Sequence, residues 1–162
     1  MRLVVKEAKG GRGVFAEEPV AAGALIIRFT GPFLRYAETT PQTYALQVGP
    51  DLYIGASGGL DDYINHSCEA NAGMKMIGEG REVVVNLHAV REIARGEEIY
   101  FDYSTVMAED DFEFDCRCGS PICRGRIRDG KHLPPAIWER YLALGILPGY
   151  VIESRRRLLE RL

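Results

Sequence analysis

The segment 61–73, DDYINHSCEANAG, concentrates side chains that could bind a ligand or a metal. Within residues 65–71 it brings together Asn65, His66, Ser67, Cys68 and Asn71. Burying such groups is costly unless each of them has a hydrogen-bond or coordination partner. The segment therefore predicts a site at which these side chains hold a ligand, a metal or another part of the chain.

The other three cysteines lie close together at Cys116, Cys118 and Cys123, with the spacing Cys-x-Cys-x4-Cys. The sequence shows no export signal, and in a reducing compartment clustered thiols bind zinc more often than they form disulfides. With Cys68 as fourth ligand, one zinc ion would tie this knuckle to segment 61–73, and such an ion contributes on the order of 10 kcal/mol to folding. The alternative is four free, partly buried thiols.

Acidic side chains are concentrated in one run. Residues 96–115 contain eight of them and no Lys or Arg: Glu97, Glu98, Asp102, Glu109, Asp110, Asp111, Glu113 and Asp115. Residues 124–162 reverse the balance, with nine Lys or Arg against four Asp or Glu. A run of this kind is commonly a solvated loop. The alternative is a surface that attracts a cationic partner.

Length and composition indicate one ordinary soluble domain with small appendages. The chain has 162 residues, of which 46% are apolar and 27% charged, and its formal net charge is -3. These values exclude a disordered chain and do not indicate a generic nucleic-acid binder. The start, MRLVVKEAKGG, has neither a signal peptide nor a membrane span, and no segment reaches the roughly 18 apolar residues of a spanning helix. We expect no membrane association and a cytoplasmic or other intracellular location.

Short strands make up most of the expected secondary structure. β-branched and aromatic residues between Gly, Pro, Asn or Asp predict strands over 2–6, 13–16, 24–29, 44–48, 52–54, 73–77, 82–87 and 98–103. Helices are expected only at the end, over 134–144 and, after a break at 147–149, over 151–162. The apolar stripe of the last helix indicates packing on its own domain rather than a dimer seam. The predicted fold class is mainly β.

Four motifs follow one another along the chain: GRGVFA (11–16), YINHSCEAN (63–71), GEEIYFDYS (96–104) and CRCGSPICRG (116–125). In this order and at these separations they resemble a SET domain and the cysteine-rich post-SET segment of protein-lysine methyltransferases. The resemblance implies a β-clip of small sheets with a knot-like crossing, a zinc-binding post-SET knuckle and C-terminal helices. It divides the chain into a SET domain (1–110), the knuckle (111–130) and a helical extension (131–162).

The resemblance also implies ligands and residue roles. S-adenosylmethionine would bind on one face, and a substrate lysine would enter from the other through a narrow channel. Cofactor contacts would come from Gly11, Arg12, Gly13, Tyr63, Asn65 and His66. The channel would be lined by Phe29, Phe101 and Tyr103, with Tyr103 as the catalytic residue. One structural zinc would be held by Cys68, Cys116, Cys118 and Cys123. Taken singly, Asn65 could cap a turn and His66 could be a core histidine, and we expect Asn71 to support the local turn.

Three positions either differ from the common family pattern or distinguish one group of family members from another. Phe29 stands where many members have Tyr, so an aromatic wall remains but a hydroxyl is lost. Asp62-Tyr63-Ile64 replaces Arg-Phe-Ile, so Asp62 would have to meet the amino group of the cofactor. Phe101 occupies a position where Phe often accompanies di- or trimethylation, which predicts more than one methyl group per lysine.

The function implied is transfer of methyl groups from S-adenosylmethionine to lysine in a basic protein segment, histone-like or other, which the acidic run would steer. One alternative is a non-catalytic, zinc-stabilised SET-like module that binds basic peptides, but such a module would be expected to have lost Asn65, His66 or Tyr103. Another is a zinc-ribbon nucleic-acid binder. The acidic run beside the knuckle argues against direct nucleic-acid binding. The sequence does not indicate an oligomeric state.

Overall fold

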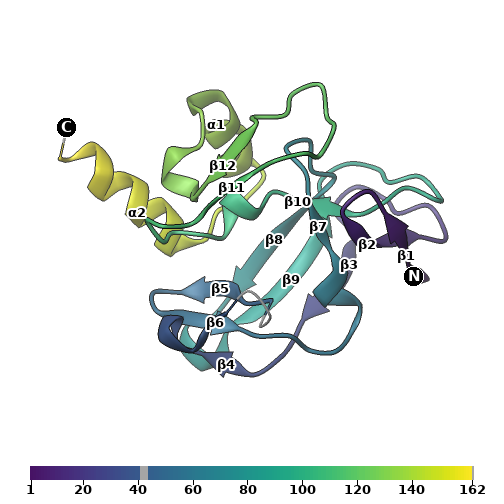
Figure 1. Ribbon diagram of the computed structural model, residues 1–162, viewed down its shortest axis with the longest axis horizontal. Coiled ribbons are helices and arrows are strands. Elements are labelled where there is room, and N and C mark those ends of the chain that lie inside the picture. The colour runs from purple at the N-terminus through teal and green to yellow at the C-terminus, as the bar shows by residue number, and fades with distance from the viewer. Residues whose placement is uncertain (41–43, 162) are drawn as a thin grey trace.

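The computed structural model describes residues 1–40 and 44–161, within which the strands form five small sheets (Figure 1). The sheets, with strands in spatial order, are β1 (Leu3–Ala8) with β2 (Gly11–Ala16); β3 (Leu25–Phe29), β9 (Val84–Ala89) and β8 (Ala72–Ile77); β4 (Phe33–Leu34), β6 (Leu52–Ile54) and β5 (Leu46–Gly49); β7 (Asn65–His66) with β10 (Tyr100–Phe101); and β11 (Glu113–Asp115) with β12 (Arg126–Arg128). The predicted mainly β fold is confirmed.

The main core lies against the sheet β3-β9-β8. Strand residues alternate between the two faces of a sheet, and in β9 Val85, Leu87 and Ala89 point inward and are buried. Met74 of β8 stands opposite Leu87 in the antiparallel register and is 1% exposed. Apolar residues of the β1–β2 hairpin, such as Val14, complete the same core. This core is the support on which the site is built.

A parallel pair of very short strands joins the two central motifs. Tyr100 stands opposite Asn65 and Phe101 opposite His66, and the backbone N–H of Ser67 donates to the carbonyl of Phe101 at 3.2 Å. Parallel strands need a crossover connection, which here runs through β8 and β9. The pairing sets segments 63–71 and 96–104 side by side near the centre of the molecule (Figure 1).

Two helices follow the sheets, α1 (Pro135–Ala143) and α2 (Gly149–Leu159). Pro135 starts α1 without loss, because the first N–H groups of a helix have no partner within it. Pro148 is in the same way the N-cap of α2, so the helix begins at Gly149, earlier than the predicted 151. A second apolar cluster, centred on Trp138 and Val151, lies beneath the helices. Both helices pack on their own chain through Trp138, Tyr141 and Val151. Of the apolar stripe predicted for the last helix, Ile152 and Leu159 are exposed instead, and Leu162 lies outside the described residues.

Close backbone contacts fix these helices to the sheets. A Cβ on Gly73 of β8 would lie 2.6 Å from the side chain of Ile146, in the loop between the helices. A Cβ on Gly130 would lie 2.4 Å from Val151 of α2. Only glycine leaves room for such approaches. None of the described helices is long and apolar enough to cross a membrane.

Several expected boundaries differ from the structure. The strand predicted over 98–103 is restricted to β10, and Tyr103 opens a 3-10 turn, Tyr103–Thr105, because the carboxylate of Asp102 caps it by accepting from the N–H of Ser104 at 3.1 Å. The strand predicted over 44–48 begins at Leu46. Strands β4, β7, β11 and β12 were not expected, since elements of two or three residues are too short to show a period.

Candidate active site

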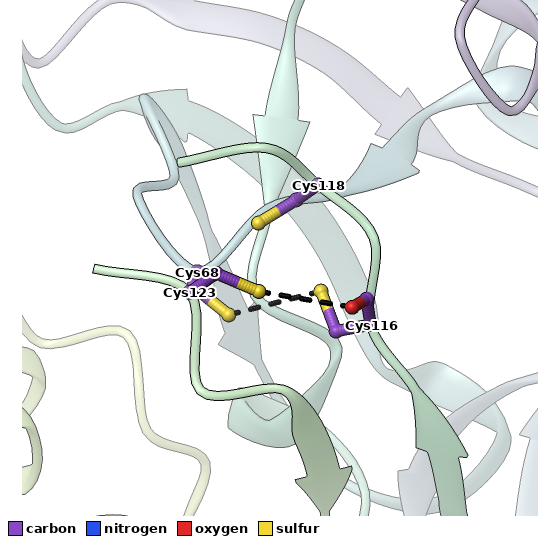
Figure 2. A group of neighbouring side chains, drawn as sticks. All are labelled: Cys68, Cys116, Cys118 and Cys123. Carbon is purple, nitrogen blue, oxygen red and sulfur yellow. Dashed lines mark hydrogen bonds between the residues drawn. The ribbon is translucent and has the colours of Figure 1, made fainter. Parts of the chain in front are cut away.

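The four cysteines meet at one place, as their spacing predicted. Figure 2 shows the thiols pointing toward one another from two separate parts of the chain, and the four sulfur atoms all lie within 4.8 Å of one another. The Sγ atoms of Cys68 and Cys116 are 3.9 Å apart, so no disulfide joins them. The ladder between β11 and β12 holds the knuckle in shape, because the N–H of Cys116 donates to the carbonyl of Gly125 at 2.6 Å.

This sulfur cluster fits a tetrahedral zinc ion. A Zn–S bond is about 2.3 Å long, which places two thiolates of a tetrahedron about 3.8 Å apart. That spacing matches the measured Cys68–Cys116 separation. The backbone N–H of Arg124 points to the sulfur of Cys68 at 3.4 Å, the kind of outer contact that orients a ligand. The chemistry of the donor set therefore suits one structural zinc.

Residues of the first and second motifs form a second cluster on the other side of β7. The side-chain N–H groups of Asn65 donate to the carbonyl of Arg12 at 2.9 Å and to the carboxylate of Glu98 at 2.8 Å. The guanidinium of Arg12 lies 4.3 Å from the ring centroid of Tyr63, and its Nη1 donates to the Tyr63 hydroxyl at 3.2 Å. Gly13 leaves no room for a side chain, because a Cβ would lie 2.1 Å from Glu98.

Glu98 is a site residue that the sequence reading missed. It is 8% exposed, and besides Asn65 it accepts a hydrogen bond from the hydroxyl of Tyr100 at 2.5 Å. Glu98 belongs to the acidic run 96–115, which resembles a solvated loop, and its neighbours in the sequence do not indicate that it is buried. Its position two residues before Tyr100 is the only signal that could have suggested a pair.

The expectation that Asn71 supports the local turn is wrong. Its side chain does not serve the local turn but reaches the third motif, where its Nδ2 donates to the carbonyl of Glu98 at 2.8 Å and to the carboxylate of Glu97 at 3.1 Å. Its Oδ1 accepts the N–H of Tyr100 at 2.9 Å. Asn71 therefore clamps segments 63–71 and 96–104 together, a contact between distant parts of the sequence.

Asp62 also has local partners. Its carboxylate accepts the backbone N–H groups of Ser57 at 2.9 Å and Gly58 at 2.7 Å, so it closes the loop that precedes the second motif.

His66 lies between the sulfur cluster and Tyr103. Its side chain is 6% exposed, and burial lowers its pKa to about 4, although the nearby Asp102 acts in the opposite direction. Its Nδ1 accepts the N–H of Tyr103 at 3.1 Å, which requires an unprotonated Nδ1. The ring is therefore neutral at physiological pH. Its centroid is 5.4 Å from that of Tyr103.

Tyr103 is the point at which the clusters meet a cavity. Its hydroxyl donates to the carbonyl of Ile64 at 2.9 Å, and burial, together with the charge of Glu98, raises its pKa to about 12. Its ring is 4.7 Å from that of Phe101, which in turn meets Phe29 edge-on at 6.2 Å. Phe101 thus contacts both of the other predicted channel residues, and all three line the cavity.

The cavity has a volume of about 690 Å³ and an aromatic wall with an acidic rim. Five further aromatic residues line it beside the predicted three: Tyr36, Tyr44, Tyr53, Phe112 and Phe114. The ring centroid of Phe114 also lies 5.3 Å from that of His66. Five carboxylates line it: Asp61, Asp62, Glu109, Asp111 and Glu113. Among the described residues that line the cavity, none is Lys, Arg or His. The arrangement suits an elongated cationic side chain.

The acidic side of the cavity is held in place by neutral donors. The hydroxyl of Tyr53 donates to Glu109 at 2.6 Å and the side-chain amide of Gln47 donates to it at 3.1 Å. The hydroxyl of Tyr36 donates to Asp111. Because these partners carry no charge, they leave the negative charge of Glu109 and Asp111 unneutralised. Glu113 is instead paired with Arg126, whose Nη2 lies 2.5 Å from its carboxylate.

Comparisons with known proteins agree with this geometry. The family model described as "SET domain" matches residues 11–104. Among curated relatives, the chain is 31% identical over 126 residues to histone-lysine N-methyltransferase trr of Drosophila melanogaster, covering 70% of this chain and 5% of that protein. It is 32% identical over 127 residues to the H3 lysine-4 specific histone-lysine N-methyltransferase of Saccharomyces cerevisiae, covering 70% and 12%. The chain therefore spans only a small part of these relatives.

A solved structure gives the same result in three dimensions. The structure of KRYPTONITE in complex with mCHG DNA and SAH superimposes with a TM-score of 0.67 at 28% identity, over 77% of this chain and 28% of that one. A complex of KRYPTONITE with mCHH DNA, H3(1-15) peptide and SAH gives a TM-score of 0.65 at 27% identity, over 77% and 29%. The fold over 77% of this chain thus has a known structural counterpart.

Proposed function

Because the chain belongs to the SET-domain family, we propose that it is a protein-lysine N-methyltransferase that uses S-adenosylmethionine. Its substrate is the side-chain amine of a lysine in a basic protein segment, histone-like or other. One observation carries the proposal: Tyr103 lines the aromatic cavity and at the same time contacts the ring of His66. The cavity and His66, one of the residues assigned to the cofactor, therefore meet at Tyr103.

The cluster around Asn65 is the proposed cofactor site. The residues assigned to it are Gly11, Arg12, Gly13, Tyr63, Asn65 and His66. S-adenosylmethionine supplies a methyl group on a positively charged sulfur, and the SAH named in the two KRYPTONITE complexes supports a ligand of this class. The exposed Arg12–Tyr63 stack and the open Gly11, with φ of 121°, provide flat and backbone surfaces for such a molecule.

The reaction requires little acid–base catalysis by the protein. The lysine nitrogen forms a bond to the methyl carbon as the carbon–sulfur bond breaks, so positive charge moves rather than appears. Alignment of the two reactants alone contributes on the order of 7 to 11 kcal/mol. The lysine must arrive uncharged, and the apolar wall of Phe29, Phe101 and Phe114 favours loss of its proton to water by desolvation. The hydroxyl of Tyr103 and the carbonyl of Ile64 then orient the amine.

Zinc has a structural part in the proposal. Cys68, Cys116, Cys118 and Cys123 would hold it, and it would supply no chemistry to the methyl transfer. By joining the knuckle to the second motif it places Phe112 and Phe114 against the cavity and Arg124 against Asp102.

The acidic rim supports a basic substrate. A cavity with five carboxylates and no cationic lining residue within the described chain attracts a lysine-rich segment. The names of the curated relatives and the H3(1-15) peptide in a KRYPTONITE complex point to histone-type segments. DNA in those complexes leaves direct nucleic-acid binding by this chain untested. The intracellular location stays a prediction.

The test is a labelling assay with a single-atom control. The protein is incubated with labelled S-adenosylmethionine and a panel of basic proteins, and the modified residue is identified by mass spectrometry. We expect label on lysine, and a loss of about 100-fold in kcat for Tyr103→Phe with little change in cofactor affinity. Binding of the basic proteins without any label transfer would favour the non-catalytic module instead.

A further inference from the structure

A buried carboxylate next to the proposed catalytic residue collects donors from three parts of the chain. Asp102 is 1% exposed. Its Oδ1 accepts the backbone N–H of Ser104 at 3.1 Å and the guanidinium of Arg124 at 2.7 Å. Its Oδ2 accepts the hydroxyl of Tyr141 at 3.0 Å. These donors belong to the turn that carries Tyr103, to the knuckle and to α1.

The position of Asp102 connects these donors to the reaction. Asp102 is the N-cap of the turn Tyr103–Thr105, so the direction of its carboxylate sets where that turn, and with it Tyr103, begins. Arg124 directly follows Cys123 in the sequence. Its side chain contacts Asp102, and its backbone N–H points to the sulfur of Cys68. The carboxylate is thus the common support of the Tyr103 turn and the knuckle.

Tyr141 is built to be a permanent donor to this carboxylate. It is 5% exposed and packs in the apolar cluster beneath the helices. Burial and the charge of Asp102 both raise its pKa, so the hydroxyl keeps its proton. The residue lies 37 positions beyond the end of the family match at 104, in a segment to which no motif assigned a role.

We propose that Tyr141 is a positioning residue for methyl transfer, acting on Tyr103 through Asp102. The proposal rests on the proposed function. Without the Tyr141 hydroxyl, Oδ2 loses this donor while Oδ1 keeps Arg124 and Ser104. The carboxylate then has one contact fewer against rotation about its bond to Cβ, so the orientation in which it caps the Tyr103 turn is less tightly fixed.

The test compares two tyrosine hydroxyls of the helical segment. Tyr141→Phe removes only the hydroxyl and keeps the ring in its cluster. The matched control is Tyr150→Phe, because the Tyr150 hydroxyl, from α2, donates to the carbonyls of Gln47 at 2.8 Å and Val106 at 2.7 Å and not to Asp102. At a temperature where both variants are folded, we expect Tyr141→Phe to lower kcat about tenfold with KM nearly unchanged. Tyr150→Phe should retain kcat within about twofold.

A double-mutant cycle shows whether the effect passes through Asp102. In an Asp102→Asn background, Tyr141→Phe should reduce kcat by less than about twofold further, since residues that act as a unit are not additive. Equal losses of kcat in Tyr141→Phe and Tyr150→Phe, or full additivity in a folded double variant, would overturn the proposal and leave Tyr141 a purely structural residue.

NMR separates failure of this proposal from failure of the proposed function. If the wild-type protein methylates no substrate, the proposed function fails, but the backbone amide of Ser104 and the Nη2–H groups of Arg124, which both donate to Asp102, still report on its carboxylate. We expect both resonances to shift in Tyr141→Phe and to stay in place in Tyr150→Phe. Unchanged resonances in Tyr141→Phe would show that its hydroxyl does not hold the carboxylate, which overturns the positioning role independently of activity.

Discussion

Phe101 is the single residue with the most direct bearing on the product. Its ring is 3% exposed, lies between Phe29 and Tyr103, and brings no polar atom to the cavity wall. A hydroxyl at this position could hold a water molecule in the space that additional methyl groups need. This is the physical content of the prediction that more than one methyl group is added per lysine.

The prediction is tested with Phe101→Tyr. We expect the wild-type protein to give di- or trimethyl-lysine and the variant to give mainly monomethyl-lysine, at a rate for the first transfer within about tenfold. Intact-mass analysis of a peptide with one lysine measures the product distribution at equal turnover. The same mixture from both proteins would contradict the role given to Phe101.

The pKa of Tyr103 predicts the alkaline side of the pH profile. Burial raises this pKa to about 12, above the value of about 10 for an exposed phenol. The folded state therefore gains stability from the protonated hydroxyl, and this gain is fully present below about pH 10 and is lost as pH rises through 12. A free lysine has a pKa of about 10.4. Because only the uncharged lysine reacts, the rate of methyl transfer at low substrate concentration should rise about tenfold per pH unit between about pH 7 and 9.

Steady-state rates over this range, with folding checked by circular dichroism at each pH, measure the profile. A decline below about pH 10 in a protein that is still folded would mean that Tyr103 ionises much earlier than its buried position implies.

At the scale of elements, we expect the fold of the knuckle to depend on the proposed zinc ion. The two short strands β11 and β12 bury few side chains, of which Ile127 is one, so the sulfur cluster has to supply the link to segment 61–73. A structural zinc contributes on the order of 10 kcal/mol to such a region. Removal of the ion should free the segment that carries Phe112 and Phe114, while the sheet β3-β9-β8 stays folded.

Chelation tests this dependence. We expect a strong zinc chelator to abolish methyl transfer and to increase hydrogen exchange in residues 112–128, with little change in β8 and β9, and added zinc but not magnesium to restore both. The metal content is measured by mass spectrometry before and after. Full activity of a zinc-free protein would refute the structural role of the ion.

For the molecule as a whole, the charge around the cavity is negative. Five carboxylates line the cavity, and none of the described lining residues is Lys, Arg or His. A basic segment is therefore attracted to the cavity side by a field that salt screens within about 10 Å at 0.1 M. KM for a lysine-rich peptide should increase several-fold between about 50 and 300 mM salt.

The control is a peptide with one lysine in an otherwise neutral sequence, for which KM should change much less. Glu113→Gln and Asp111→Asn, which remove rim charge and keep size, should reduce the salt dependence of the lysine-rich peptide. A KM that is independent of salt for both peptides would show that the acidic rim does not steer the substrate.

The sequence predicted those features that a short stretch of residues can encode. The ligand-type side chains Asn65, His66 and Cys68 stand within four positions, and the three-cysteine spacing and the motif around Tyr103 are equally local. Their types restrict the chemistry, because thiolates select a metal such as zinc and an aromatic wall selects an uncharged amine. The mainly β fold followed from strand patterns in the same way.

Only the tertiary structure decided which partners these residues meet. Several hydrogen bonds of the site join positions separated by more than twenty residues. They link Asp102 to Arg124 and Tyr141, Glu98 to Asn65, and Asn71 to Glu98. Such pairs leave no period in the sequence, since either partner alone resembles an ordinary surface residue or a core tyrosine. They form because chain crossings bring buried polar groups together, and burial makes a polar group without a partner costly.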